Sequence, residues 1–133
     1  MSETKGQVIV VEDNPALLRV VQVVLNNAGY SVTTAENGEQ AWKLIQKNDF
    51  DLVITDEQMP GMSGTELCRV LRSDEKYESL PVFLLTARGL ELDLERLKRE
   101  LNINEAFAKP FSPTALIDVV NTCLSPTSLN QVQ

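Results

Sequence analysis

Five side chains that can take part in catalysis or metal binding follow short apolar runs in the sequence. Each lies directly after the end of such a run: Glu12 and Asp13 after residues 8–11, Asp56 after 52–55, Thr86 after 82–85, and Lys109 after 106–108. If these runs are parallel strands of one sheet, their carboxyl ends meet at one edge, where open α/β sheets bind ligands. Three carboxylates, one hydroxyl and one ammonium group would then converge there.

Carboxylates that gather at one point repel one another. A pair about 4 Å apart costs on the order of 4 kcal/mol at an effective dielectric constant of about 20. Taken singly, each acid is an ordinary solvated loop residue, but together they need a cation, and Mg²⁺ suits a few carboxylates, a carbonyl and waters. Lys109 adds a positive charge and Thr86 a hydroxyl donor. The set can stabilise phosphoryl oxygens beside a carboxylate nucleophile, which predicts phosphoryl transfer to Asp56.

The composition excludes several other kinds of function. The chain has 133 residues, of which 43% are hydrophobic, enough for one domain with a packed core. Its 19 acidic and 12 basic residues give a net charge of −7, which argues against direct nucleic-acid binding. The absence of histidine excludes imidazole metal sites and Ser-His or Cys-His catalysis.

The cysteines and the apolar segments indicate where the protein resides. Cys68 and Cys123 lack the C-x-x-C spacing of zinc or redox sites and are expected to be buried as small apolar residues. No stretch approaches the roughly 20 apolar residues that span a bilayer. We therefore expect a cytoplasmic protein without a membrane partner.

The apolar runs alternate with segments of helical period. A weaker strand is expected at residues 31–35, and helices are expected at 14–28, after Asn37, at 64–72, at 90–101 and at 112–124. Nearly continuous apolar strands suit a sheet that is covered on both faces. The pattern predicts an α/β fold: an open, doubly wound, five-stranded parallel sheet with five helices.

The apolar positions of the helices predict which side chains pack. On the first helix, which we expect to end at Gly29, six residues form one core-facing stripe: Leu17, Val20, Val21, Val24, Leu25 and Ala28. Trp42, on the second helix beside its apolar stripe, is expected to serve packing. Val23 and Leu92 fall off the apolar faces and are expected to be exposed.

Four segments together resemble the receiver domain of bacterial two-component response regulators. They are Val10-Val11-Glu12-Asp13-Asn14, Thr55-Asp56-Glu57-Gln58-Met59-Pro60-Gly61-Met62-Ser63-Gly64, Leu85-Thr86-Ala87 and Ala108-Lys109-Pro110-Phe111. The resemblance runs from about Gln7 to Leu124 and implies a flavodoxin-like, CheY-like fold. We expect a receiver domain at residues 1–124 and a polar tail at 125–133 that resembles a linker.

The resemblance also implies a role for each matching residue. Asp56 would accept a phosphoryl group from a histidine kinase, a phosphotransfer protein or a small acyl phosphate. Thr86 and Lys109 would contact phosphoryl oxygens. Proline after this lysine is commonly cis in the family, so Lys109-Pro110 is a candidate for a cis bond. Mg²⁺ would be held by three carboxylates and one backbone carbonyl: those of Glu12, Asp13 and Asp56, and that of Gln58.

One position departs from the family pattern. Receivers commonly carry an aromatic residue three positions before the lysine, where this chain has Ala106. Phe107 is next to it, but adjacent strand residues face opposite sides of the sheet. We therefore expect the signal to pass through Thr86 and the segment 88–101. Gln58 and Arg88 border the site as tuning positions, and we expect Arg88 to slow hydrolysis of the phosphoryl group.

Alternative functions fit less well. A haloacid-dehalogenase-like enzyme needs a second acid two residues after the nucleophile, where this chain has Gln58. A degenerate receiver that acts as a scaffold without phosphorylation remains the alternative, although Asp13, Asp56, Thr86 and Lys109 are all present. We expect a switch with only self-phosphorylation and slow autophosphatase activity rather than an enzyme, monomeric or weakly dimeric. It would act on a downstream protein or on an output domain beyond residue 133.

Overall fold

The computed structural model describes residues 4–87 and 91–124, with the backbone alone at 91–94. Its strands are β1 (Gln7–Val11), β2 (Ser31–Ala35), β3 (Leu52–Asp56), β4 (Val82–Thr86) and β5 (Glu105–Ala108). Its helices are α1 (Pro15–Asn27), α2 (Gly38–Lys47), α3 (Gly64–Arg72), α4 (Glu91–Leu101) and α5 (Pro113–Leu124). The expectations for Arg88, for the Leu92 side chain and for the tail at 125–133 lie outside the described residues.

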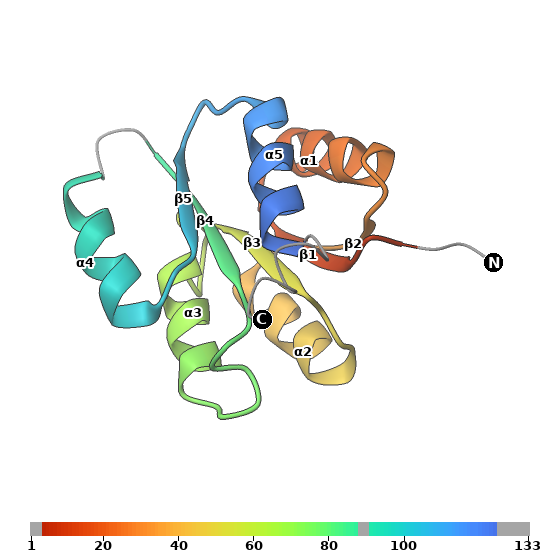
Figure 1. Ribbon diagram of the computed structural model, residues 1–133. Helices are drawn as coiled ribbons and strands as arrows, with labels where there is room; N and C mark the ends of the chain where they lie inside the picture. Colours follow the sequence, from red (N-terminus) through yellow and green to blue (C-terminus); the bar gives the residue numbers. More distant parts are fainter. Residues whose placement is uncertain (1–3, 88–90, 125–133) are drawn as a thin grey trace, which may run out of the picture.

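The five strands form one parallel sheet in the order β2-β1-β3-β4-β5, which confirms the predicted fold class. Figure 1 shows α1 and α5 together on one side of the sheet and α2, α3 and α4 on the other. The strand order reverses at β1, so the carboxyl ends of β1 and β3 border the crevice where such sheets bind ligands. None of the described helices has the length and apolar character needed to cross a membrane.

Both faces of the sheet are buried, and this explains the continuous apolar runs. In β1, Ile9 and Val11 pack toward α2 and α3, whereas Val8 and Val10 pack toward α1 and α5. Strands β3 and β4 alternate in the same way, and all their residues are buried. A sheet packed on both sides is a rigid platform for the side chains at its edge.

Strands β3 and β4 each extend one residue beyond the predicted apolar run. Asp56 pairs with Leu85, and Thr86 pairs with Ala108, so both polar residues close their strands instead of following them. The pairing continues into the loops, because Glu57 donates a backbone hydrogen bond to Leu85 and Lys109 donates one to Thr86. Both reactive side chains therefore start from ordered sheet backbone.

The apolar stripe of α1 is narrower than the sequence predicts. Val21 and Leu25 are buried, but Val20 is 46% exposed and lies on the rim of a groove of about 490 Å³ beside Phe111. Successive helical residues are about 100° apart, so Val20 falls outside the arc centred on Val21 and Leu25. The helix ends as predicted, with Gly29 at a positive φ of 105°.

Other packing predictions are largely confirmed. Trp42 is partly buried and packs edge-on against Tyr77, with 5.5 Å between ring centroids. Val23 is exposed and Cys68 is fully buried, as expected. Cys123 is only half-buried, which corrects the prediction, because it lies in the last turn of α5 and lines a surface groove with Lys5.

The first turn of α3 lies directly against the end of β3. A Cβ atom added to Gly64 would collide with the carbonyl oxygen of Asp56. We expect Gly64→Ala to lower the free energy of unfolding by about 2 kcal/mol, measured by urea denaturation, because backbone cannot give way. Gly38→Ala is the comparison at the first residue of α2, where the added atom is also crowded but meets side-chain atoms of Met62 and not a backbone carbonyl, so a smaller loss is expected. Equal losses in the two variants would contradict this account.

Candidate functional site

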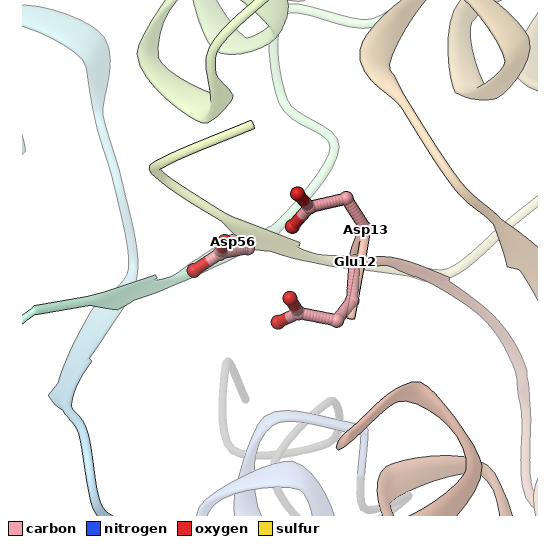
Figure 2. Close-up of side chains that lie close together, drawn as sticks. All are labelled: Glu12, Asp13 and Asp56. Carbon is pink, nitrogen blue, oxygen red and sulfur yellow. The ribbon is translucent and has the colours of Figure 1, made fainter. Parts of the chain in front are cut away.

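Three carboxylates gather at the carboxyl ends of β1 and β3. One oxygen from each of Glu12, Asp13 and Asp56 lies within 4.8 Å of the other two. Figure 2 shows the side chains of Glu12 and Asp13 leaving the end of β1 toward the side where Asp56 lies. Oxygen ligands at this spacing fit a Mg²⁺ ion, which takes one or two carboxylates and keeps several waters.

Lys109 neutralises part of this negative charge. Its Nζ lies 2.7 Å from Asp56 Oδ1 and 3.3 Å from Glu12 Oε1. The backbone N–H of Lys109 continues the pairing of β5 with β4 by donating to Thr86. From there the side chain reaches past β4 to Asp56 at the end of β3. The Lys109-Pro110 bond is cis, as is common in the family that the sequence resembles.

The two carboxylates that touch Lys109 are almost fully buried. Burial raises the pKa of Asp56, which is 3% exposed, and this effect outweighs the hydrogen bond and positive charge of Lys109; the charge of Asp13 raises the pKa further. Burial likewise raises the pKa of Glu12, although Glu12 accepts a hydrogen bond from the Asn14 backbone N–H. The positive charge of one lysine is therefore not enough to compensate the burial of these two carboxylates.

The pKa of Lys109 shifts in the direction that favours its charged form. Burial of this side chain, which is 29% exposed, lowers its pKa, but the ion pairs with Asp56 and Glu12 raise it by more. The lysine is less buried than its partners, so the pairing dominates for Lys109 and burial dominates for the acids. The acids can therefore accept a further cation, and the charged Lys109 can pair with a different anion.

The structure places the other candidate residues as follows. Thr86 is buried at the end of β4, between β3 and β5, and its hydroxyl donates a long hydrogen bond of 3.4 Å to the carbonyl of Ala87. Gln58 is exposed in the loop after β3, two residues from Asp56. The tuning position Arg88 falls outside the described residues.

Ala106 and Phe107 face opposite sides of the sheet, as expected. Ala106 packs toward the core under α2, α3 and α4. Phe107 packs on the other side, with its ring centroid 5.9 Å from that of Phe83 and 6.2 Å from that of Phe111. Phe107 therefore does not occupy the place of an aromatic residue at position 106.

Sequence reasoning missed a pair of residues beside the acidic cluster. Glu57 Oε1 accepts hydrogen bonds from the backbone N–H and the hydroxyl of Thr65, at 2.7 and 2.6 Å. An acidic residue at the beginning of a loop that leads into a helix is a signal that could have suggested this contact. The path of the loop between them, which decides whether the groups meet, is not visible in the sequence.

Comparisons with known proteins agree on one family. The model of the response regulator receiver domain matches residues 8–121. A chemotaxis protein CheY homolog of Campylobacter jejuni is 32% identical, over 92% of this chain and 95% of the relative. The phosphate regulon transcriptional regulatory protein PhoB of Pseudomonas aeruginosa is 35% identical, over 90% of this chain and 52% of that protein.

Solved structures show the same architecture. The chemotaxis response regulator CheY4 of Vibrio cholerae superposes with a TM-score of 0.80 at 28% identity, over 88% of this chain and 97% of that one. The receiver domain of sensor histidine kinase PA1611 of Pseudomonas aeruginosa superposes with a TM-score of 0.79 at 28% identity, over 90% of this chain and 97% of that one. That neighbour has a magnesium ion coordinated in its active site cleft.

The burial of the acids predicts how stability depends on pH in metal-free solution. The pKa values of Glu12 and Asp56 are raised above their ordinary values of 4.5 and 3.8, so between the folded and unfolded pKa values the folded protein binds more protons. Their contribution to the free energy of unfolding should therefore increase as pH falls through the raised values and level off below the ordinary ones.

The variant Asp56→Asn isolates the share of Asp56. In buffer with a chelator, its urea midpoint should exceed that of the wild type near neutral pH, and the difference should vanish at acid pH, where Asp56 is protonated in both states. A difference that stays constant with pH would contradict the raised pKa.

Proposed function

The chain belongs to the family of response regulator receiver domains, and from this premise we propose that Asp56 is its phosphoacceptor. A receiver domain takes a phosphoryl group from a histidine kinase and so switches the binding of a partner. The observation that carries the assignment is the contact of 2.7 Å between Lys109 Nζ and Asp56 Oδ1, beside the carboxylates of Glu12 and Asp13. The phosphodonor is the phosphohistidine of a sensor kinase or phosphotransfer protein.

The chemistry follows from the charges around Asp56. A carboxylate oxygen of Asp56 attacks phosphorus; the new O–P bond forms as the N–P bond of the donor breaks, and the histidine leaves with the electron pair. Lys109 starts paired with Asp56 and exchanges this carboxylate for a phosphoryl oxygen. Thr86 exchanges its long bond to Ala87 for another phosphoryl oxygen.

Glu12, Asp13, Asp56 and the backbone carbonyl of Gln58 are the proposed ligands of Mg²⁺. When bound, the ion would supply the positive charge that Lys109 alone does not. The spacing of the carboxylates supports this assignment, and so does the burial of Asp56 and Glu12, which leaves their charge undercompensated.

The proposed switch does not use an aromatic side chain at position 106. Thr86 ends β4, and α4 follows it in the chain, so a shift of Thr86 toward the phosphoryl group moves the backbone that leads into α4. Receiver domains are not conventional enzymes, and the chemistry of this switch is limited to self-phosphorylation and slow loss of the phosphoryl group. The intact set of Asp13, Asp56, Thr86 and Lys109 favours this function over a scaffold that works without phosphorylation.

Phosphorylation tests the assignment directly. Incubation with acetyl phosphate and Mg²⁺ should add one phosphoryl group to the wild type, detected by intact mass spectrometry, and none to Asp56→Asn or in the presence of a chelator. Peptide mapping should place the group on Asp56. Equal labelling of Asp56→Asn, or a wild type that stays unlabelled, would refute the proposal.

The lifetime of the phosphoryl group tests Arg88 separately. A guanidinium two residues after Thr86 pairs with phosphoryl oxygens and hinders the attacking water. The half-life of phospho-Asp56 should therefore be shorter in Arg88→Ala than in the wild type, and nearly unchanged in the exposed control Arg96→Ala on α4. An unaltered half-life in Arg88→Ala would remove the tuning role.

A further inference from the structure

The loop at residues 57–63 joins the phosphoacceptor strand to α3 and carries Gln58, a proposed ligand of Mg²⁺. The backbone of its first residue, Glu57, forms one hydrogen bond to β4 and one to the beginning of α3. The Glu57 N–H donates to the carbonyl of Leu85 in β4 at 2.7 Å, and the Glu57 carbonyl accepts from the N–H of Gly64 in α3 at 3.1 Å. The first residue of the loop therefore contacts the residue that follows its last one, and the loop is closed at its base.

The side chain of Glu57 adds two further bonds to α3. Its Oε1 accepts from Thr65 N–H at 2.7 Å and from Thr65 Oγ1 at 2.6 Å. Hydrogen bonds to a charged oxygen are stronger than neutral ones, and an anion at a helix N-terminus is favoured by the helix dipole. Thr65 is the second residue of α3, so the carboxylate holds the beginning of this helix.

The first turn of α3 is thereby fully provided with acceptors. The N–H of Gly64 donates to the Glu57 carbonyl, that of Thr65 to the Glu57 carboxylate, and that of Glu66 to Ser63 Oγ at 3.1 Å. The cap at Ser63 is encoded locally, as a capping box with Glu66. The bonds of Glu57 instead reach across the loop and close it.

This engagement also keeps Glu57 out of the acidic cluster. Glu57 follows Asp56 directly, yet the described carboxylates that gather closely enough to hold an ion are those of Glu12, Asp13 and Asp56. Thr65 holds the Glu57 carboxylate at the helix end instead. A fourth acid beside the site therefore serves a purpose other than metal ligation.

We propose that Glu57, held by Thr65, is a positioning residue that fixes the loop 57–63 in the conformation needed to bind Mg²⁺. The inference rests on the proposed function, because it assumes that the Gln58 carbonyl is a ligand. A loop already closed in the free protein loses little conformational entropy when the ion binds. If the Glu57–Thr65 contact is lost, the loop must be ordered when Mg²⁺ binds. This costs conformational entropy, so the affinity for Mg²⁺ falls.

The test is a titration of the full chain with MgCl₂, followed by NMR of the backbone amides. Glu57→Gln should raise the dissociation constant about tenfold, as the loss of an indirect supporting contact of a metal site does. Thr65→Val, which changes no charge, should raise it by about threefold, the equivalent of one modest hydrogen bond. Thr65→Ser keeps the hydroxyl and should restore the wild-type value.

Glu66→Gln is the matched control. It removes one negative charge from the same end of α3, where Glu66 accepts from Ser63 N–H at 2.8 Å, but it leaves the Glu57–Thr65 contact in place. Its affinity for Mg²⁺ should equal that of the wild type. In the metal-free protein, the amide proton of Thr65 should also shift in Glu57→Gln, which reports the weakened bond independently of the ion.

Two results would overturn the inference and leave the proposed function intact. If Thr65→Val binds Mg²⁺ as the wild type does while Glu57→Gln binds more weakly, Glu57 acts through its charge and not through the loop. If both variants bind like the wild type, the contact has no influence on the site. A wild type that binds no Mg²⁺ would overturn the proposed function as well, so the two failures are distinguishable.

Discussion

The charges that meet around Asp56 decide what the site can bind and what the fold has to hold in place. Two buried carboxylates and one exposed carboxylate meet at the end of the sheet, and one lysine reaches both buried groups. Burial raises the pKa of Asp56 and Glu12 in spite of that lysine, so the site retains an unmet demand for positive charge. In the proposed function, a metal ion held by the carboxylates and a phosphoryl group paired with Lys109 would together balance these charges.

The fold maintains this balance because both faces of the sheet are packed. The strands of the site are neighbours in the sheet, and backbone bonds continue the pairing past Asp56 and Thr86 into Glu57 and Lys109. On the side of α3, Gly64 lies against the Asp56 carbonyl and Glu57 ties the loop to Thr65. Lys109 and the exposed groove beside Val20 lie on the other side, toward α1 and α5. The reactive carboxylate is thus supported by backbone from several elements.

Much of this architecture could be predicted from local patterns. The strands were visible because two-sided burial leaves continuous apolar runs, and the helix at residues 64–72 was predicted from its helical apolar period. The structure adds a local capping box of Ser63 and Glu66 at its start. The convergence of Glu12, Asp13, Asp56 and Lys109 followed from the rule that parallel strands end at one edge. Val20 and Cys123 were misjudged because exposure at the margin of a helix depends on how far its neighbours extend. The Glu57–Thr65 contact depends on the path of a loop, which sequence periodicity does not encode.

The most direct test of the charge balance is the pKa of the Asp56 carboxyl itself, measured by NMR of the side-chain carboxyl carbon with and without Mg²⁺. The pKa of Asp56 should lie above the ordinary value in the metal-free protein, because burial outweighs the pairing with Lys109, and should fall markedly once the ion is bound. A pKa at or below the ordinary value without metal, or one that Mg²⁺ leaves unchanged, would contradict this expectation.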